Sequence, residues 1–249
     1  MWKPIILVLI ILVLLIVSCI KQQNKKVTFQ KDTDTTDNSI SLKSSSTLIC
    51  WMTSDSTLNP EDEIQKVFKR LGVDYKDLNS QQWNPKDSTI GGVRDYMLSK
   101  IAPAGTSWNC ILLHLNSQLG EKLSIELSKN QKTPVITFFE FDQIAWGYCL
   151  YQEGKLADQF CNDPDVIEEE PAAYRGNIDT LIKTFNVEKS KIEPYLKHIS
   201  EIKDSTKAFS DDECTLDDHW VRADFMKKLG LTYPDNGKWI YIVEKGINN

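Results

Sequence analysis

An apolar run near the start of the chain, from Ile5 to Ile20, constrains the chain's organisation more than any other feature. Its sixteen residues are apolar throughout, apart from Ser18 and Cys19. A run of this length falls between the core of a signal peptide and a minimal membrane span. It therefore predicts either a cleaved export signal or a membrane anchor, with a separate folded part behind it.

The end of this run reads Ile16-Val17-Ser18-Cys19, and Lys3 supplies a positive charge before it. The pattern resembles the signal of bacterial lipoproteins, with an aliphatic residue at −3, a small residue at −1 and then the cysteine. The resemblance implies cleavage before Cys19, diacylglycerol on its sulfur and a fatty acid such as palmitate on the freed amine. Each buried CH₂ contributes about 0.8 kcal/mol, so two or three acyl chains would hold the protein on a membrane nearly permanently.

An uncleaved anchor is the alternative. The 17 residues from Pro4 to Ile20 rise about 1.5 Å each, which just spans a hydrocarbon core of about 30 Å. Lysines flank the run on both sides and do not decide between the two interpretations. We favour lipid attachment at Cys19.

The stretch at 21–47 is rich in Ser, Thr, Asp, Lys and Gln and has almost no apolar residues. It cannot bury enough surface to fold, so we expect a flexible tether with an end-to-end distance of roughly 30 Å. The predicted organisation is a signal peptide at 1–18, a lipidated tether at 19–47 and one globular domain at 48–249.

The predicted domain is acidic, with 23 Lys and Arg against 32 Asp and Glu, and the whole chain has four arginines. An acidic surface repels phosphate backbones, so nucleic acid is not an expected partner. Direct binding to an anionic membrane is also disfavoured. The expected partners are therefore the membrane, through the lipid at Cys19, and a protein.

Six cysteines are present, and five remain if Cys19 carries lipid. An odd number argues against a full disulfide framework, and the absence of a CxxC pair leaves a zinc site without support. We interpret the remaining five as buried thiols.

The strongest local pattern in the domain spans 145–160, where two apolar runs flank Glu153-Gly154. This arrangement predicts a β-hairpin, and the apolar residues on both of its faces predict packing on both sides.

A two-residue loop in that hairpin sets a register in which Tyr151 opposes Leu156 and Cys149 opposes Asp158. Cys149 and Cys161 then lie on opposite faces, which excludes a bond between them.

Periodicity and boundary residues predict the other elements. Strands are expected at 48–52, 108–115, 133–141 and 239–243, and helices at 60–71, 93–101, 119–127, 178–185, 189–199 and 216–229. In the last helix, Trp220, Val221, Phe225 and Leu229 are expected on the buried side. Together these elements predict a fold between the α/β and α+β classes, with a mixed sheet, a central β-hairpin and helices packed on its faces.

The stretch from Leu127 to Asp165 resembles a recurrent pattern in uncharacterised bacterial proteins. The pattern has a tryptophan- and tyrosine-rich strand, a Leu-Tyr-x-x-Gly turn and an Asp-x-Phe/Tyr strand. The residues that carry it here are Leu150, Tyr151, Gly154, Asp158, Phe160, Asn162, Pro164 and Asp165. The resemblance covers under half of the chain and implies no activity.

The densest group of candidate metal ligands lies near the C-terminus. Its members are Asp211, Asp212, Glu213, Asp217, Asp218 and His219. Carboxylates with a histidine can hold a divalent metal, and Asp217, Asp218 and His219 are the best candidates. The spacing fits no EF-hand loop, however, and acidic residues before a helix also cap it. We favour the capping interpretation.

Other candidate sites are weaker. Glu140 and Asp142 could pair as acid and base, although nothing supplies a nucleophile. His114 is expected to be a core histidine, and His198 is expected at a helix C-terminus.

No motif for a serine hydrolase, a nucleotide or a dinucleotide is present, so no cofactor is expected. The first hypothesis is a non-enzymatic lipoprotein of the bacterial cell envelope, whose domain lies outside the cytoplasm and binds an unknown ligand or partner. A variant is an immunity-type protein that neutralises a toxin. The alternative is a carboxylate-based hydrolase, with or without a metal.

Overall fold

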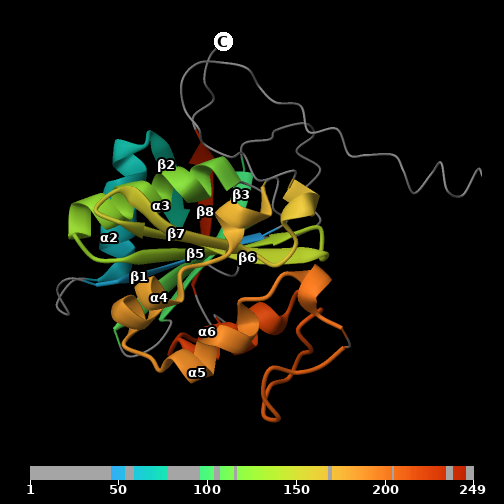
Figure 1. Ribbon diagram of the computed structural model, residues 1–249. Coiled ribbons are helices and arrows are strands. Elements are labelled where there is room, and N and C mark those ends of the chain that lie inside the picture. Colours follow the sequence, from blue (N-terminus) through green and yellow to red (C-terminus); the bar gives the residue numbers. More distant parts are fainter. Residues whose placement is uncertain are drawn as a thin grey trace, which may run out of the picture. The chain divides into compact units, whose positions relative to one another are not determined.

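An eight-stranded antiparallel sheet organises the structure (Figure 1). The computed structural model describes residues 46–53, 59–77, 96–103, 107–114, 117–167, 170–203, 205–233 and 238–244. The strand order is β2-β8-β3-β4-β1-β5-β6-β7. The strands are β1 (Ser46–Met52), β2 (Val73–Asp77), β3 (Tyr96–Pro103), β4 (Trp108–His114), β5 (Val135–Phe141), β6 (Ala145–Gln152), β7 (Lys155–Cys161) and β8 (Lys238–Glu244).

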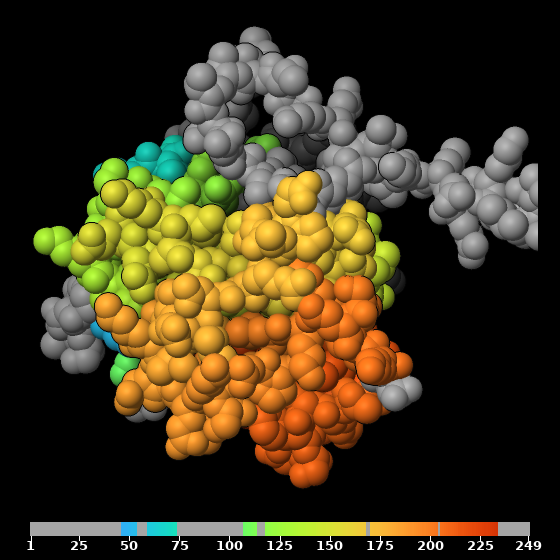
Figure 2. Space-filling view, viewed as in Figure 1, coloured from blue at the N-terminus to red at the C-terminus, as the bar shows by residue number. Residues whose placement is uncertain are grey.

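Helices cover both faces of this sheet (Figure 1). The helices are α2 (Pro60–Arg70), α3 (Ser117–Gln131), α4 (Ile178–Phe185), α5 (Lys189–Ile192) and α6 (Val221–Lys228). Helices α2 and α3 pack on one face, which we call the α2–α3 side. The segment from α4 to α6 packs on the other face, which we call the C-terminal side. In the space-filling view its orange residues form a continuous layer against the yellow β6–β7 hairpin (Figure 2).

Each side has its own hydrophobic core. On the α2–α3 side the buried residues include Ile64, Val67, Phe68, Leu119, Leu123 and Leu127, packed on Ile49, Trp51, Ile111 and Val135. On the C-terminal side they include Leu181, Ile192, Tyr195, Val221, Phe225 and Met226, packed on Leu48, Cys50, Phe138, Trp146, Tyr148 and Phe160.

Helix α2 shows why local signals were sufficient in part of the chain. The Asn59 side chain accepts a hydrogen bond from the Glu61 backbone N–H at 3.0 Å, and Pro60 occupies the first turn. Lys69 and Arg70 lie in the last turn, where they complement the helix dipole. The predicted helix at 60–71 is confirmed.

The predicted fold class is confirmed in its α+β form, with helices on both faces of the sheet. Two details of the prediction are corrected. Every pairing between the strands listed above is antiparallel, so this part of the sheet is not mixed. The β6–β7 hairpin lies at one end of the strand order rather than at its centre. Its two apolar faces arise because helices cover both sides of the sheet up to that end.

The predicted helix at 93–101 is wrong. Tyr96–Pro103 forms β3, which pairs with β4 on one side and β8 on the other. Its apolar residues Met97, Leu98 and Ile101 have a spacing that a short helix also shows, and pairing with two strands decides the conformation. The sequence analysis also missed β2 at Val73–Asp77, which pairs with β8.

The hairpin is confirmed at its turn, where Tyr151 pairs with Leu156. Beyond the turn a β-bulge shifts the register, so that Cys149 pairs with Gln159 rather than with Asp158. An extra residue reverses the face on which later side chains lie.

Because of the bulge, Phe160 lies opposite Tyr148 and stacks on it with ring centroids 5.9 Å apart. Cys161 lies opposite Gly147. The prediction that Cys149 and Cys161 lie on opposite faces is therefore wrong, and they are diagonal neighbours on one face.

The last part of the chain is less helical than predicted. Helix α4 matches the expectation, but the predicted helix at 189–199 is a short α5 followed by 3₁₀ turns, since Pro194 lacks an N–H to continue it. Helix α6 begins at Val221, five residues later than predicted. The predicted strand at 239–243 is confirmed as part of β8.

Candidate functional site

The structure brings two of the three best candidate metal ligands together, since His219 Nδ1 lies 3.4 Å from an Asp218 oxygen, whereas Asp217 binds elsewhere. Asp217 accepts a hydrogen bond from the Ser205 hydroxyl at 2.6 Å, and this bond lowers the pKa of Asp217. Asp218 accepts the Trp220 backbone N–H at 2.8 Å, just before α6 begins. Among the described residues, no group of three or more His, Cys, Asp or Glu side chains could hold a metal ion. Asp218 binds the N–H of Trp220 in the turn before the helix, and α6 has no side-chain cap at its N-terminus, so the capping interpretation is not borne out for this helix.

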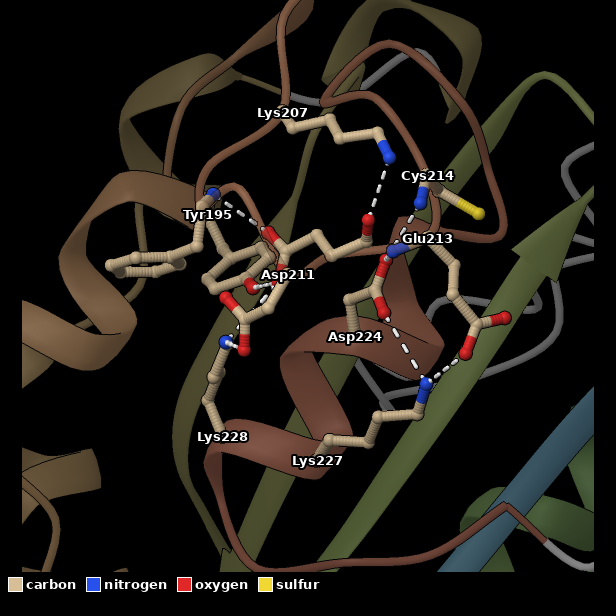
Figure 3. A network of polar contacts seen from close by, with 10 residues as sticks. Tyr195, Lys207, Asp211, Glu213, Cys214, Asp224, Lys227 and Lys228 are labelled. Carbon is tan, nitrogen blue, oxygen red and sulfur yellow. Dashed lines mark hydrogen bonds and ion pairs between the residues drawn. The ribbon is translucent and has the colours of Figure 1, made fainter.

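Asp224 holds the irregular chain before α6. It lies on α6 and is buried, with 2% of its surface exposed. One of its carboxylate oxygens accepts the backbone N–H groups of Glu213 and Cys214, at 2.9 and 2.8 Å (Figure 3). Lys227 lies 3.5 Å from its other oxygen. A carboxylate here satisfies two backbone donors that no helix or strand would satisfy.

Asp212, which lies in the loop before α6, also binds backbone and side-chain donors. Its carboxylate accepts the Tyr195 hydroxyl at 2.7 Å and the Phe209 backbone N–H at 2.9 Å. The Lys228 ammonium lies 3.2 Å from it and compensates its buried charge. Lys207 also donates to the Asp212 backbone carbonyl, at 2.7 Å. The acidic residues of this network, which is drawn in Figure 3, thus order a loop.

A third buried aspartate, Asp158, joins the hairpin to α4. It accepts the Tyr148 hydroxyl at 2.8 Å and the backbone N–H groups of Asn177 and Gln159, at 2.8 and 2.9 Å. Asn177 is itself the N-cap of α4. Burial raises the pKa of Asp158, although these three hydrogen bonds partly offset the effect.

A buried ion pair lies at the edge of the C-terminal side. Glu140 on β5 and Arg222 on α6 approach to 2.6 Å, with 7% and 2% of their surfaces exposed. The Ser46 hydroxyl, from the first residue of β1, donates to Glu140 at 3.2 Å. The guanidinium of Arg222 lies 3.4 Å from the same hydroxyl. Three distant parts of the chain therefore meet at this end of the sheet.

The predicted acid and base pair of Glu140 and Asp142 is not formed. Asp142 is exposed in the turn after β5 and adopts a φ of 46°. Glu140 is buried and binds Arg222 instead. The two carboxyl groups thus occupy different environments.

His219 connects this ion pair to the surface. Its Nε2 lies 3.6 Å from a Glu140 oxygen, and its Nδ1 lies 3.4 Å from an Asp218 oxygen. Its side chain is 18% exposed. When the ring is protonated, both nitrogens are donors, so each can point to one carboxylate.

Trp220 forms the exposed part of this region. Its exposed fraction is 43%, which corrects the prediction that it lies on the buried side of a helix. Tyr233 packs edge-on against it with centroids 5.7 Å apart, and His219 lies at 5.6 Å. The Arg222 guanidinium lies 5.2 Å from the Trp220 ring centroid. We call His219, Trp220 and Tyr233, with the buried Arg222 beneath them, the Trp220 surface.

Two other large apolar side chains, Ile144 and Leu156, are more exposed than Trp220, at 53% and 49%. Leu156 lines a hollow of about 440 Å³ at the β6–β7 turn, together with Lys132, Thr133 and Gln152. The Thr133 hydroxyl there donates to a backbone carbonyl, at 3.0 Å.

The remaining sequence candidates are structural or lie elsewhere. His198 is buried at the start of a 3₁₀ turn rather than at a helix C-terminus, and its Nε2 lies 3.2 Å from the Tyr174 carbonyl oxygen. His114 is the register partner of Ser46. Cys19 lies outside the described residues.

Sequence reasoning missed Arg222 as a buried cation. The sequence did contain a signal, because Arg222 follows apolar Val221 in a predicted buried stripe. A buried guanidinium requires a carboxylate partner, so a buried ion pair could have been predicted. The identity of that partner, Glu140, depends on the fold.

Comparisons with known proteins identified no related protein. No protein-family model matches the chain, and no curated protein or solved structure matches it at a significant level. Within the part of the chain that the structure describes, no helix combines the length and the apolar character that crossing a membrane requires.

Proposed function

We propose that the protein is a lipid-anchored binding protein whose folded domain recognises a protein partner through the Trp220 surface. The observation that carries this proposal is an exposed tryptophan packed between Tyr233, His219 and Arg222. Tryptophan and tyrosine are among the residues that dominate binding energy at protein interfaces, and the buried Arg222 supports the Trp220 ring from beneath. No catalytic step is part of the proposal.

The support beneath Trp220 favours binding. Arg222 contacts the Trp220 ring and is held by Glu140 at 2.6 Å. The backbone N–H of Trp220 is bound by Asp218. A side chain held in this way loses little conformational freedom when a partner covers it, and a smaller entropic cost means tighter binding.

The anchor is proposed from the sequence. Cys19 would carry the lipid, the tether at 19–47 would separate the domain from the membrane, and the domain would lie outside the cytoplasm in the bacterial cell envelope. The first strand begins at Ser46, close to the predicted domain boundary.

A photo-crosslinking experiment tests the binding surface. A photoreactive phenylalanine analogue replaces Trp220 in one variant and Leu156 in a matched control, since both positions are similarly exposed. After irradiation of intact cells, we expect one discrete crosslinked species from position 220 and none from 156. Added wild-type protein should compete for it in isolated membranes, and the Trp220→Ala protein should not. Equal crosslinking at both positions, or competition by Trp220→Ala, would contradict the proposal.

Metabolic labelling with a fatty-acid probe tests the anchor. Label is expected on the wild-type chain and not on Cys19→Ser. Label that persists in Cys19→Ser would exclude attachment at that residue.

The hydrolase alternative has one supporting observation, a histidine held between the carboxylates of Glu140 and Asp218. Metal analysis of the purified protein separates it from the binding proposal. Stoichiometric metal that is lost in the Asp217→Ala and His219→Ala variants would favour the hydrolase.

A further inference from the structure

Two buried cysteines face each other across the centre of the sheet. Cys50 on β1 and Cys110 on β4 are direct register partners in an antiparallel pair. Neither is in a disulfide in the structure, both have 0% of their surfaces exposed, and both belong to the core of the C-terminal side.

Their arrangement is close to that of a disulfide. Directly opposite residues on antiparallel strands have Cβ atoms about 4.5–5.5 Å apart, and a disulfide requires about 3.5–4.5 Å. The Cys110 thiol is near enough to contribute, after burial, to raising the pKa of the Cys50 thiol. A small local shift of the two strands brings the sulfur atoms to bonding distance.

We propose that Cys50 and Cys110 form a cross-strand disulfide when the chain folds in an oxidising compartment. The oxidant is a small or protein disulfide. One cysteine thiolate attacks it, forms a mixed disulfide and releases a thiol, and the second cysteine thiolate then attacks the protein sulfur and releases the other thiol. Two protein thiols lose two electrons and two protons, and the oxidant disulfide is reduced to two thiols.

The bond must form before the sheet is complete. In the folded protein both sulfurs are inaccessible to an oxidant. Burial and the contact with Cys110 also raise the pKa of the Cys50 thiol, so little thiolate is present. The redox state of this pair therefore records the compartment in which the chain folded.

The geometry selects this pair over the other cysteines. Cys149 and Cys161 are diagonal neighbours, because they pair with Gln159 and Gly147. Diagonal residues lie about 7–8 Å apart, and bridged Cα atoms are usually within about 7 Å. Cys214 lies in the loop before α6, where its N–H is bound by Asp224. One disulfide and three thiols are thus expected at these five cysteines.

Refolding of the full-length chain tests the proposal. The reduced, unfolded protein is refolded in detergent with a mixture of reduced and oxidised glutathione, or with reduced glutathione alone. Free thiols are then alkylated under denaturing conditions, and proteolytic peptides are identified by mass spectrometry. We expect a linked peptide of Cys50 and Cys110 after the first treatment only, with Cys149, Cys161 and Cys214 alkylated.

Two variants control the assignment. Cys149→Ala should retain the linked peptide, whereas Cys110→Ala should leave Cys50 alkylated. Alkylation of both Cys50 and Cys110 in the oxidatively refolded wild type, or a bond between Cys149 and Cys161, would overturn the proposal, and neither result depends on the variants folding.

The same peptide map of protein isolated from cells tests location separately. A disulfide there supports folding outside the cytoplasm. A disulfide on refolding with free thiols in the cellular protein would confirm the geometry and contradict the proposed location.

Discussion

The two sides of the sheet are held together by different means. On the α2–α3 side, α2 and α3 satisfy their backbone groups internally, and an apolar core contacts the sheet beside the Trp51–Glu63 and Ser124–Thr137 hydrogen bonds. On the C-terminal side, much of the chain between α5 and α6 is irregular, and its backbone needs other acceptors. Buried aspartates provide them. Asp212 and Asp224 accept backbone N–H groups there, and Asp158 does the same for Asn177 just before α4.

This difference shows how acidic residues near the C-terminus are used, since several of them bind backbone donors of an irregular loop. A carboxylate that accepts two backbone N–H groups, as Asp224 does, has its charge compensated by the chain itself. Comparison of the two sides shows that a cluster of acidic residues in the sequence can serve to hold an irregular loop in one conformation. The Glu140–Arg222 pair then fastens α6 to the sheet.

The largest loss in the free energy of unfolding is expected when the Glu140–Arg222 ion pair is broken. Replacing Arg222 by Met leaves Glu140 buried without its cation, and losing one partner of a buried pair costs about 3–5 kcal/mol. Urea unfolding at neutral pH measures the change.

The matched control replaces both partners, Glu140→Gln together with Arg222→Met. It should recover at least half of the loss, because no unpaired charge remains. A single-variant loss below about 1 kcal/mol would show that the pair is not what holds the C-terminal side, since such values are typical of exposed pairs.

Asp224→Ala should have the next largest effect. It removes the acceptor of the Glu213 and Cys214 N–H groups, and a hydrogen bond to a charged group contributes about 1.5–3 kcal/mol. On the α2–α3 side, Ser124 is also buried, but its hydroxyl bonds the Gly120 carbonyl and the Thr137 hydroxyl. Removing it in Ser124→Ala should cost about 1 kcal/mol. Equal losses in the two variants would remove the distinction between the two sides.

The smallest expected effect is on how the free energy of unfolding depends on pH, and it concerns Asp158. Burial raises its pKa, so the folded state binds the proton more tightly than the unfolded state does. Its contribution to the free energy of unfolding is therefore full below its unfolded pKa and is lost as pH rises through the folded pKa.

Asp158→Asn removes this titration and retains an oxygen for the two N–H groups. The variant should gain stability relative to the wild type between pH 4 and pH 7, as measured by urea unfolding at both values. A relative gain at pH 4 instead would mean that the pKa of Asp158 is lowered by folding.

Sequence reasoning predicted elements that local signals define. Helix α2 has its cap, its first-turn proline and its last-turn cations within a dozen residues, and the hairpin turn at Glu153-Gly154 is equally local. It failed at β3, where pairing with β4 and β8 decides the conformation. It also failed at the bulge, because the extra residue in β7 follows the turn and carries no turn signal of its own.

The candidate site was predictable only in part. Glu140 and His219 were recognised as candidates, but their contacts were not. Glu140 and Arg222 are far apart in the sequence, so no spacing connects them. Trp220 is exposed and lies just before α6, in a turn where Asp218 accepts its backbone N–H. Loop contacts of this kind are not visible as periodicity.

Amide hydrogen exchange tests most directly the claim that buried aspartates order the C-terminal side. It is measured at Glu213 and Cys214 in the wild type, in Asp224→Ala and in Ser124→Ala. The account predicts that both amides are protected in the wild type and in Ser124→Ala. In Asp224→Ala they should exchange rapidly, while the amides of α3 stay protected. Rapid exchange of Glu213 and Cys214 in the wild type, or unchanged protection in Asp224→Ala, would contradict it.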